Sequence, residues 1–160
     1  MNARPEKSTA LCTIATAWLV VGTLDIMSAI GIWLSRGTTL MRGFQAIASG
    51  LLGPKSYQGG LAIATFGLAI HFFIALVVVA IFYVASGKIH FLTQHAIVSG
   101  VLYGIIVYLA MYWIVLPMSF PTFRHRVDND LLELAIHIVL IGLPTALIVR
   151  RFSRPAEEAR

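Results

Sequence analysis

The chain has 160 residues, of which 58% are hydrophobic and only 12% are charged. Soluble domains have about 25% charged residues, so this composition excludes an ordinary soluble domain and predicts one integral membrane domain over residues 1–160. The basic residues behind the formal net charge of +5 flank apolar segments, which indicates contact with a lipid bilayer and argues against a nucleic-acid partner. Cys12 is the only cysteine, which excludes an internal disulfide and a cysteine-based metal cluster.

The first apolar segment, about residues 10–34, is long enough to cross a bilayer as a helix. A helix rises about 1.5 Å per residue, so a hydrocarbon layer about 30 Å thick needs about 20 residues. The segment is too long for the core of a cleaved signal peptide, and we expect it to remain in the protein, capped by Ser8 or Thr9. Its single charge, Asp25, should face other helices, because an aspartate in mid-membrane is unfavourable by about 2.5–3.5 kcal/mol.

The segment after the first span is too polar and too interrupted to cross the membrane. Thr38 or Thr39 is expected to cap a short helix over about residues 39–52, which Gly53 and Pro54 would end. This helix is about 20 Å long, too short to span, and we predict an amphipathic helix at the membrane interface or a lid over the bundle. Its apolar face would carry Leu40, Phe44, Ile47 and Leu51, and its polar face Arg42, Gln45 and Ser49.

The second span, about residues 60–85, has no formal charge and carries one histidine, His71, near its middle. Small residues recur on the same helical face as His71 at intervals of three or four. Such residues let two membrane helices approach closely, where hydrophobicity alone gives no preference for protein over lipid. We therefore expect this helix to be the packing centre of the bundle, with contacts through Gly60, Ala64 and Gly67.

The third span is expected over about residues 94–116, capped by Thr93 and ended by Pro117. One face carries small residues at strict four-residue spacing, followed by two tyrosines at the same spacing. The small residues include a GxxxG motif, which is typical of close helix contact in membranes. The packing residues are Gly100 and Gly104, and the tyrosines are Tyr108 and Tyr112.

The fourth span is expected over about residues 131–149. Asp130 and Glu133 have the spacing of a capping box, in which the first side chain caps the helix and the second reaches back. His137 follows one turn later. Pro144 should kink the helix, because it removes one backbone donor.

Four spans place both termini on the same side of the membrane. Seven of the twelve basic residues lie on that side (Arg4, Lys7, Lys88, Arg150, Arg151, Arg154 and Arg160). This bias predicts cytoplasmic termini. On the opposite side, next to Arg36, four basic residues are candidates for contact with lipid headgroups: Arg42, Lys55, Arg124 and Arg126.

Four polar side chains are expected at similar depths in the half of the membrane opposite the termini. At 1.5 Å per residue, the depth is about 13 Å for Asp25, 16 Å for His71, 13 Å for Tyr108 and 9 Å for His137. The four side chains should therefore converge on one buried polar cluster, roofed by the short helix over residues 39–52.

The function remains open between several classes. The chain contains no HExxH, GxSxG or Gly-rich phosphate motif, so we predict no catalytic residue, no metal site and no bound cofactor. His71 and His137 supply a possible pair of b-type haem ligands, but their depths differ by about 6 Å, a poor match for one iron. We favour a non-enzymatic subunit that packs with other membrane subunits or with itself. The alternative is a small proton or solute permeation protein that uses the buried cluster.

Several segments together resemble a family of small bacterial four-helix inner-membrane proteins that has no characterised function. The resemblance covers about residues 20–150 and implies four spans and a location in the bacterial cytoplasmic membrane. It implies no activity, cofactor or site residue. The segments that carry it are 45–53, 59–60, 67–75, 100–104 and 116–119.

Overall fold

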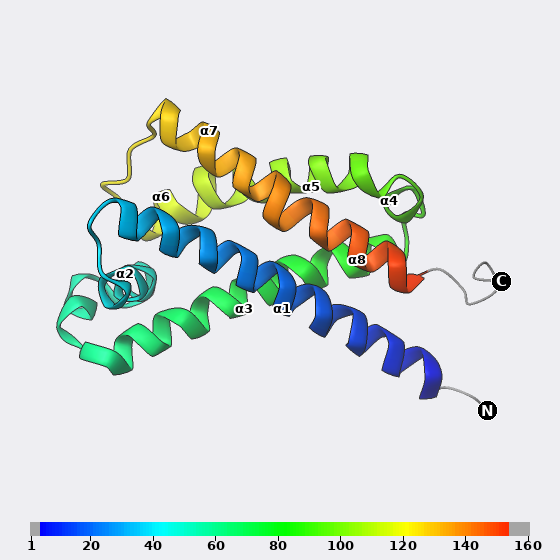
Figure 1. Cartoon of the computed structure of the whole chain (residues 1–160), viewed down its shortest axis with the longest axis horizontal. Coiled ribbons are helices and arrows are strands. Elements are labelled where there is room, and N and C mark those ends of the chain that lie inside the picture. Colours follow the sequence, from blue (N-terminus) through cyan, green and yellow to red (C-terminus); the bar gives the residue numbers. More distant parts are fainter. Residues whose placement is uncertain (1–3, 154–160) are drawn as a thin grey trace.

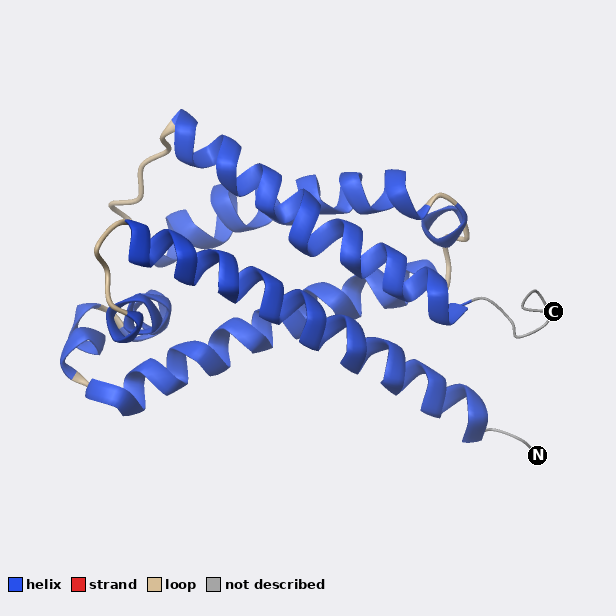
Figure 2. Cartoon of the chain, viewed as in Figure 1, coloured by secondary structure: helices blue, strands red, loops and turns tan. Residues whose placement is uncertain are grey.

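The computed structural model describes residues 4–153, with side chains from residue 10 onward. This part of the chain consists of helices and loops and contains no strand (Figure 2). Four helical segments are long and apolar enough to cross a membrane: Ala10–Ser35, Gly60–Ser86, Ala96–Ser119 and Val127–Ser153. The fold class predicted from the sequence, a bundle of four transmembrane helices, is therefore confirmed.

The first two spans cross each other and the other two lie alongside them (Figure 1). The first span belongs to α1 (Arg4–Ser35) and the second is α3 (Gly60–Ser86). The third combines α5 (Ala96–Ala110), the π-helical segment η2 (Met111–Val115) and α6 (Leu116–Ser119). The fourth combines α7 (Val127–Ile136), the π-helical segment η3 (His137–Gly142) and α8 (Leu143–Ser153). Two short helices, α4 (Phe91–Gln94) and the 3-10 helix η1 (Pro54–Gln58), lie in the connections.

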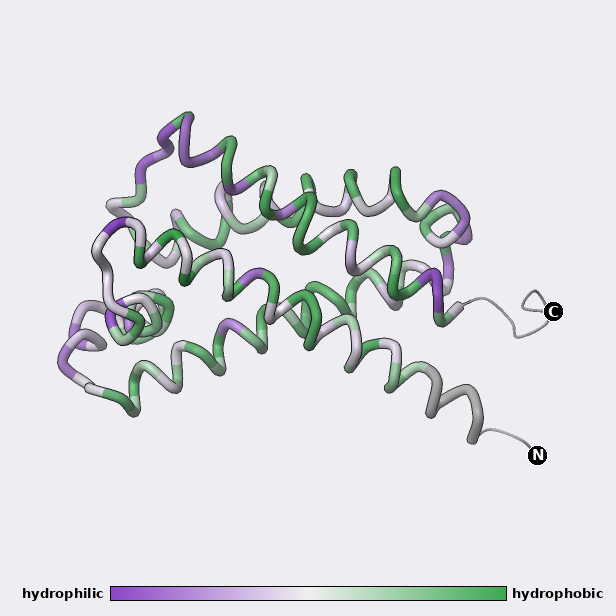
Figure 3. The backbone as a smooth tube through the Cα atoms, viewed as in Figure 1, coloured by the Kyte–Doolittle hydropathy of each residue, from purple (hydrophilic) through white to green (hydrophobic). Residues whose placement is uncertain are grey.

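Hydrophilic segments gather at the two ends of the bundle, and the middle is mainly hydrophobic (Figure 3). Both ends of the chain lie at the same end of the bundle (Figure 1). Large apolar side chains are exposed on the outer faces of the spans, including Leu61, Phe73, Ile97 and Val139. An apolar surface of this kind is suited to contact with lipid rather than water.

Helix α2 (Leu40–Leu52) lies across the spans at the end of the bundle opposite the termini (Figure 1). As predicted, Thr39 caps it: the Thr39 hydroxyl accepts a hydrogen bond from the backbone N–H of Arg42 at 3.3 Å. Gly53, with a φ of 75°, ends it before Pro54.

The faces of α2 differ in part from the prediction. Gln45 and Ser49, expected on the outer polar face, are buried against the bundle, whereas Leu40 and Leu51 are exposed. The Gln45 amide donates to the carbonyl of Gly60 at 3.0 Å, which holds this side of α2 against the bundle. Phe44 and Ile47 are half-buried, and Arg42 is exposed as expected.

Close helix contacts occur at small residues. A side chain at Gly67 would overlap the carbonyl of Phe44, so α2 lies directly on the backbone of α3. A Cβ at Gly100 would lie 2.9 Å from the Cα of Leu143, and one at Gly104 would lie 2.5 Å from the Cα of Ile138. Ala64 is buried.

Gly60 differs from this pattern and does not act as a helix-packing residue. It is exposed, and an added Cβ would meet nothing within 4 Å. Its φ of 59° instead allows the chain to turn from η1 into α3.

The third span does not end before Pro117 as predicted but continues to Ser119. In η2 a backbone N–H bonds to the carbonyl five residues earlier instead of four, and the N–H of Leu116 thus donates to the carbonyl of Met111. The same change occurs in η3, where the N–H of Leu143 donates to Ile138 just before Pro144. A proline has no N–H to donate, and both prolines directly follow such a π-helical segment, which accommodates them within a continuous helix.

Two predicted helix caps, at Thr93 and Asp130, are not present in the expected form. Helix α5 begins at Ala96 with no side-chain cap, and the Thr93 hydroxyl donates to the carbonyl of His90 instead. Helix α7 begins at Val127, before Asp130, whose carboxylate contacts Nδ1 of His125 at 3.0 Å. Helix α1 begins at Arg4, and the side chains of the proposed caps at positions 8 and 9 lie outside the described part of the chain.

The glycine contact between α5 and η3 predicts a specific loss of stability. Gly104→Ala should lower the free energy of unfolding by about 1–3 kcal/mol, because the added methyl group meets backbone atoms that cannot move independently. Gly31→Ala is the control, since nothing lies within 4 Å of its Cβ position. It should leave stability unchanged or raise it by up to about 1 kcal/mol. Reversible unfolding in mixed micelles measures both, and equal effects would contradict the contact.

Candidate functional site

A cavity of about 560 Å³ lies between α1, α2, α3 and the third and fourth spans. Its volume is within the range of about 300–1,000 Å³ that is usual for small-molecule sites. Most of its lining is apolar, from Val21 on α1 through Ile47 and Ile74 to Ile141 on η3. Three ionisable side chains also line it: Asp25, His71 and His137.

The crossing of α1 and α3 positions the first two of these side chains. Gly22 leaves room for the ring of Phe72, which would lie 2.7 Å from a Cβ at that position. The indole N–H of Trp18 donates to the carbonyl of Phe72 at 2.7 Å. These contacts hold the preceding residue, His71, against α1.

His71 is bonded on one side and faces a carboxylate on the other. Its Nε2 lies 2.9 Å from the carbonyl oxygen of Gly22. A carbonyl only accepts, so Nε2 must carry the proton and donate it. The other ring nitrogen, Nδ1, lies 3.8 Å from Oδ2 of Asp25. The Asp25 side chain is 30% exposed, toward the cavity that it lines.

His137 has the opposite arrangement. Its Nδ1 lies 2.8 Å from the carbonyl oxygen of Glu133, one turn earlier in the same span, and therefore donates. In the neutral ring, Nε2 is then the nitrogen with a free lone pair. The rings of Tyr108 and Tyr112 pack edge-on against the imidazole, each with its centroid 5.9 Å away.

The structure thus brings Asp25, His71 and His137 to one cavity, while Tyr108 lies behind His137 and does not line it. Tyr108 instead stacks on Tyr112 with ring centroids 4.9 Å apart. Tyr112 also contacts Phe123, with ring centroids 5.8 Å apart. These contacts fix the outer wall behind the imidazole.

The three polar groups of the cavity share one chemical property. With both histidines neutral, each presents an acceptor nitrogen, and an ionised Asp25 presents only acceptor oxygens. The site is therefore suited to a group that donates hydrogen bonds, such as a hydroxyl or an ammonium. Within residues 10–153, no three histidine, cysteine or acidic side chains are arranged to hold a metal ion. That the protein binds no cofactor stays a prediction, and an absorption spectrum of the purified protein would test it for haem.

The cavity is open toward the lipid-facing surface of the protein. Two of its lining side chains, Leu51 on α2 and Phe73 on α3, are 71% and 65% exposed. Both belong to the apolar outer surface. The cavity therefore adjoins the surface that faces lipid.

The half of the bundle nearer the termini is closely packed. One buried cluster contains Ala17, Val21, Val79, Val107 and Ile141. A second contains Phe82, Ala96, Ala146 and Val149. These two clusters separate the polar groups of the cavity from the end where the chain termini lie.

The predicted headgroup residues all lie at the end of the bundle that carries α2, and all are exposed. The Arg42 guanidinium stacks over the ring of Tyr57 at 4.9 Å from its centroid, and Lys55 is in η1. Arg124 and Arg126 line a second pocket together with Arg36, which our sequence analysis did not single out.

Comparisons with protein-family models, with curated proteins and with solved structures find no match for this chain. The resemblance to a bacterial membrane family therefore stays a prediction, and the function has to be argued from the site itself.

The hydrogen bonds of the two cavity histidines predict different tautomers. In the neutral state His71 should carry its proton on Nε2 and His137 on Nδ1, because each donates to a backbone carbonyl. Nitrogen-15 spectra of the labelled protein in micelles distinguish the two forms. The exposed His90 should show the average of both tautomers and serves as the reference. A proton on Nδ1 of His71 would show that its bond to Gly22 does not form.

Proposed function

We propose that this protein is a membrane-embedded binding protein for an amphipathic small molecule. The polar head of the ligand donates hydrogen bonds to Asp25, His71 and His137, and its apolar part lies against the remaining wall of the cavity. The observation that carries the proposal is the clustering of three acceptor groups in an otherwise apolar cavity that opens toward lipid. Apolar pockets with a few converging polar groups are the usual form of small-molecule sites.

The chemistry of the head group follows from the geometry. When Asp25 is ionised and His71 is neutral, the carboxylate and the ring nitrogen Nδ1, 3.8 Å apart, both accept hydrogen bonds. A ligand hydroxyl or ammonium placed between Asp25 and His71 supplies the donor. Such a bond is worth more in the membrane interior than at the surface, because water does not compete for it.

This proposal is compatible with the expected role as a subunit, since a bound lipid-like molecule can be passed to a partner protein. The alternative role in permeation receives less support. A relay of protons or solutes needs polar groups along the whole depth of the membrane. In the terminal half, the two buried clusters are apolar, and the hydroxyls of Ser86, Ser99 and Thr145 donate to backbone carbonyls.

We also infer that the termini lie in the cytoplasm of a bacterial cell and that α2 lies on the outer face of the inner membrane. The basic residues in the last turn of the fourth span, Arg150 and Arg151, support this orientation. A fluorescent-protein fusion at the C-terminus, which matures only in the cytoplasm, tests the orientation. A dark fusion in a stable, membrane-inserted protein would reverse it.

Filling the cavity should remove the ligand without unfolding the protein. Ala46 lines the cavity, and Ala46→Phe places a ring inside it. The matched control is Ala69→Phe, because Ala69 is exposed on α3 and does not line the cavity. Mass spectrometry of solvent extracts from gently purified protein should find the same small molecule with wild type and with Ala69→Phe, at near one-to-one ratio. We expect at least a tenfold loss with Ala46→Phe.

The polar head is tested separately. Asp25→Asn keeps the shape of the side chain but removes its charge. A hydrogen bond to a charged group contributes about 1.5–3 kcal/mol, so the affinity for the co-purified molecule should fall about tenfold or more. If the extracts of wild type and Ala46→Phe contain the same molecules in the same amounts, the cavity does not hold a ligand and the proposal is wrong.

A further inference from the structure

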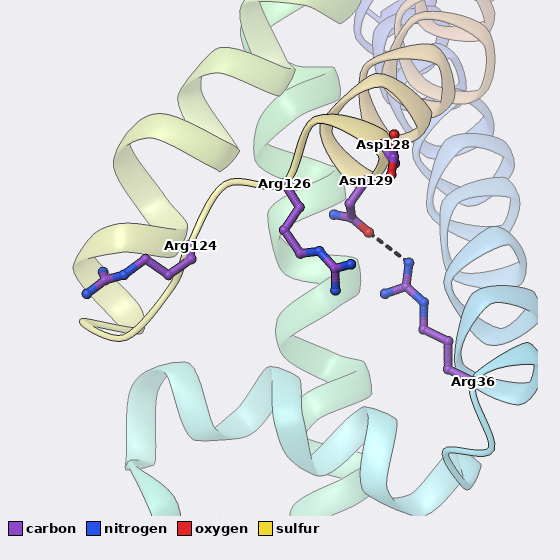
Figure 4. A pocket seen from close by; sticks show the side chains of 5 residues that line it. All are labelled: Arg36, Arg124, Arg126, Asp128 and Asn129. Atoms are coloured by element: carbon purple, nitrogen blue, oxygen red, sulfur yellow. Dashed lines mark hydrogen bonds between the residues drawn. The ribbon is translucent and has the colours of Figure 1, made fainter.

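A second pocket, of about 400 Å³, lies at the end of the bundle that carries α2, where α1 ends and α7 begins. It is separate from the cavity described above and shares no lining residue with it. Its lining side chains come from the residue after α1 and from the loop and first turn of α7: Arg36, Arg124, Arg126, Asp128 and Asn129 (Figure 4).

Two guanidinium groups approach each other in this pocket. Arg36 is held in place because its Nη2 donates to the side-chain oxygen of Asn129 at 2.8 Å. The side chain of Arg126 reaches toward Arg36 from the other wall, whereas Asp128 points away from the space between them (Figure 4). Arg124 is turned outward, and its Nη1 donates to the carbonyl of Phe123 at 3.1 Å.

Within the described residues no carboxylate forms a close ion pair with either guanidinium, although Asp128 lines the same pocket. The ion pairs there join His71 to Asp25 and His125 to Asp130, and neither involves an arginine. Two like charges that face each other repel, and the arrangement is favourable only when an anion lies between them. The pair therefore has the form of an anion site.

The position of the pocket indicates which anion it receives. Arg36 follows directly on Ser35, the last residue of the first span, and Arg126 directly precedes Val127, the first residue of the fourth. Residues at the ends of spans lie at the level of the lipid headgroups. The N-terminus of α7 contributes backbone donors and partial positive charge at the same place.

We propose that Arg36 and Arg126 bind a phosphate group at this pocket. The planar guanidinium donates two parallel hydrogen bonds to phosphate oxygens, and two such groups from different spans hold the anion from opposite sides. Phosphate binding joins the end of α1 to the beginning of α7. The site is independent of the proposed ligand of the central cavity.

The test uses the full chain in an uncharged maltoside detergent and follows thermal unfolding by tryptophan fluorescence. Short-chain phosphatidylglycerol is added in one arm, inorganic phosphate in the second, and a diacylglycerol without phosphate in the third. Phosphatidylglycerol should raise the unfolding temperature of the wild type, and the diacylglycerol should not. A rise with inorganic phosphate alone would identify free phosphate as sufficient, and its absence would identify a lipid headgroup as the source.

Arg126→Gln is the decisive variant, because the Arg126 side chain makes no ion pair within the described chain. It should need about tenfold more phosphate-bearing ligand for the same rise. Lys88→Gln removes an exposed charge at the opposite end of the bundle and should respond like the wild type. Without added anion, Arg126→Gln should unfold at the same or a higher temperature, since the repulsion is relieved. An unchanged response of Arg126→Gln, or an equal loss in Lys88→Gln, would overturn the proposal.

Discussion

The hydrogen bond from His71 to the carbonyl of Gly22 is the contact on which the arrangement of the site depends. It joins α1 to α3 where they cross and lies in the membrane, where water does not offer an alternative partner. It also fixes the tautomer of His71, and the second ring nitrogen is thereby directed at Asp25. The cost of placing a carboxylate in the membrane is reduced by the same contact, since the cavity and the imidazole replace lipid around Asp25.

Hydrophobic length and small-residue spacing were sufficient to predict the four spans, because both are local properties of the chain. The predicted boundaries differ from the observed ones by a few residues, most of all at the first helix, which begins at Arg4 and not near residue 10. Caps and faces were less predictable, since they depend on distant partners. Gln45 turns toward the bundle because its amide donates to the carbonyl of Gly60, fifteen residues later in the chain. The spacing of polar and apolar residues in α2 does not predict this hydrogen bond.

The depth of the site residues was predictable from the sequence, whereas their direction was not. Helical rise alone places Asp25, His71 and His137 at comparable depths, and the structure brings them to one cavity. Rise does not specify rotation about the helix axis, which is why Tyr108 lies behind the imidazole instead of beside it. Arg36 and Arg126 are ninety positions apart, and only the packing of the first span near the fourth makes them neighbours.

The π-helical segment η3 changes the direction in which the later side chains of the fourth span point. Each residue of an α-helix turns the chain by about 100°, so one additional residue in a turn offsets every later side chain by that angle. His137 stands at the start of η3, and Ala146 and Val149 follow it. In a regular helix, nine residues at about 100° each would place Ala146 on the face opposite His137. The wide turn reduces that angle by about 100°, so that His137, Ala146 and Val149, which are all buried, lie toward the interior of the bundle.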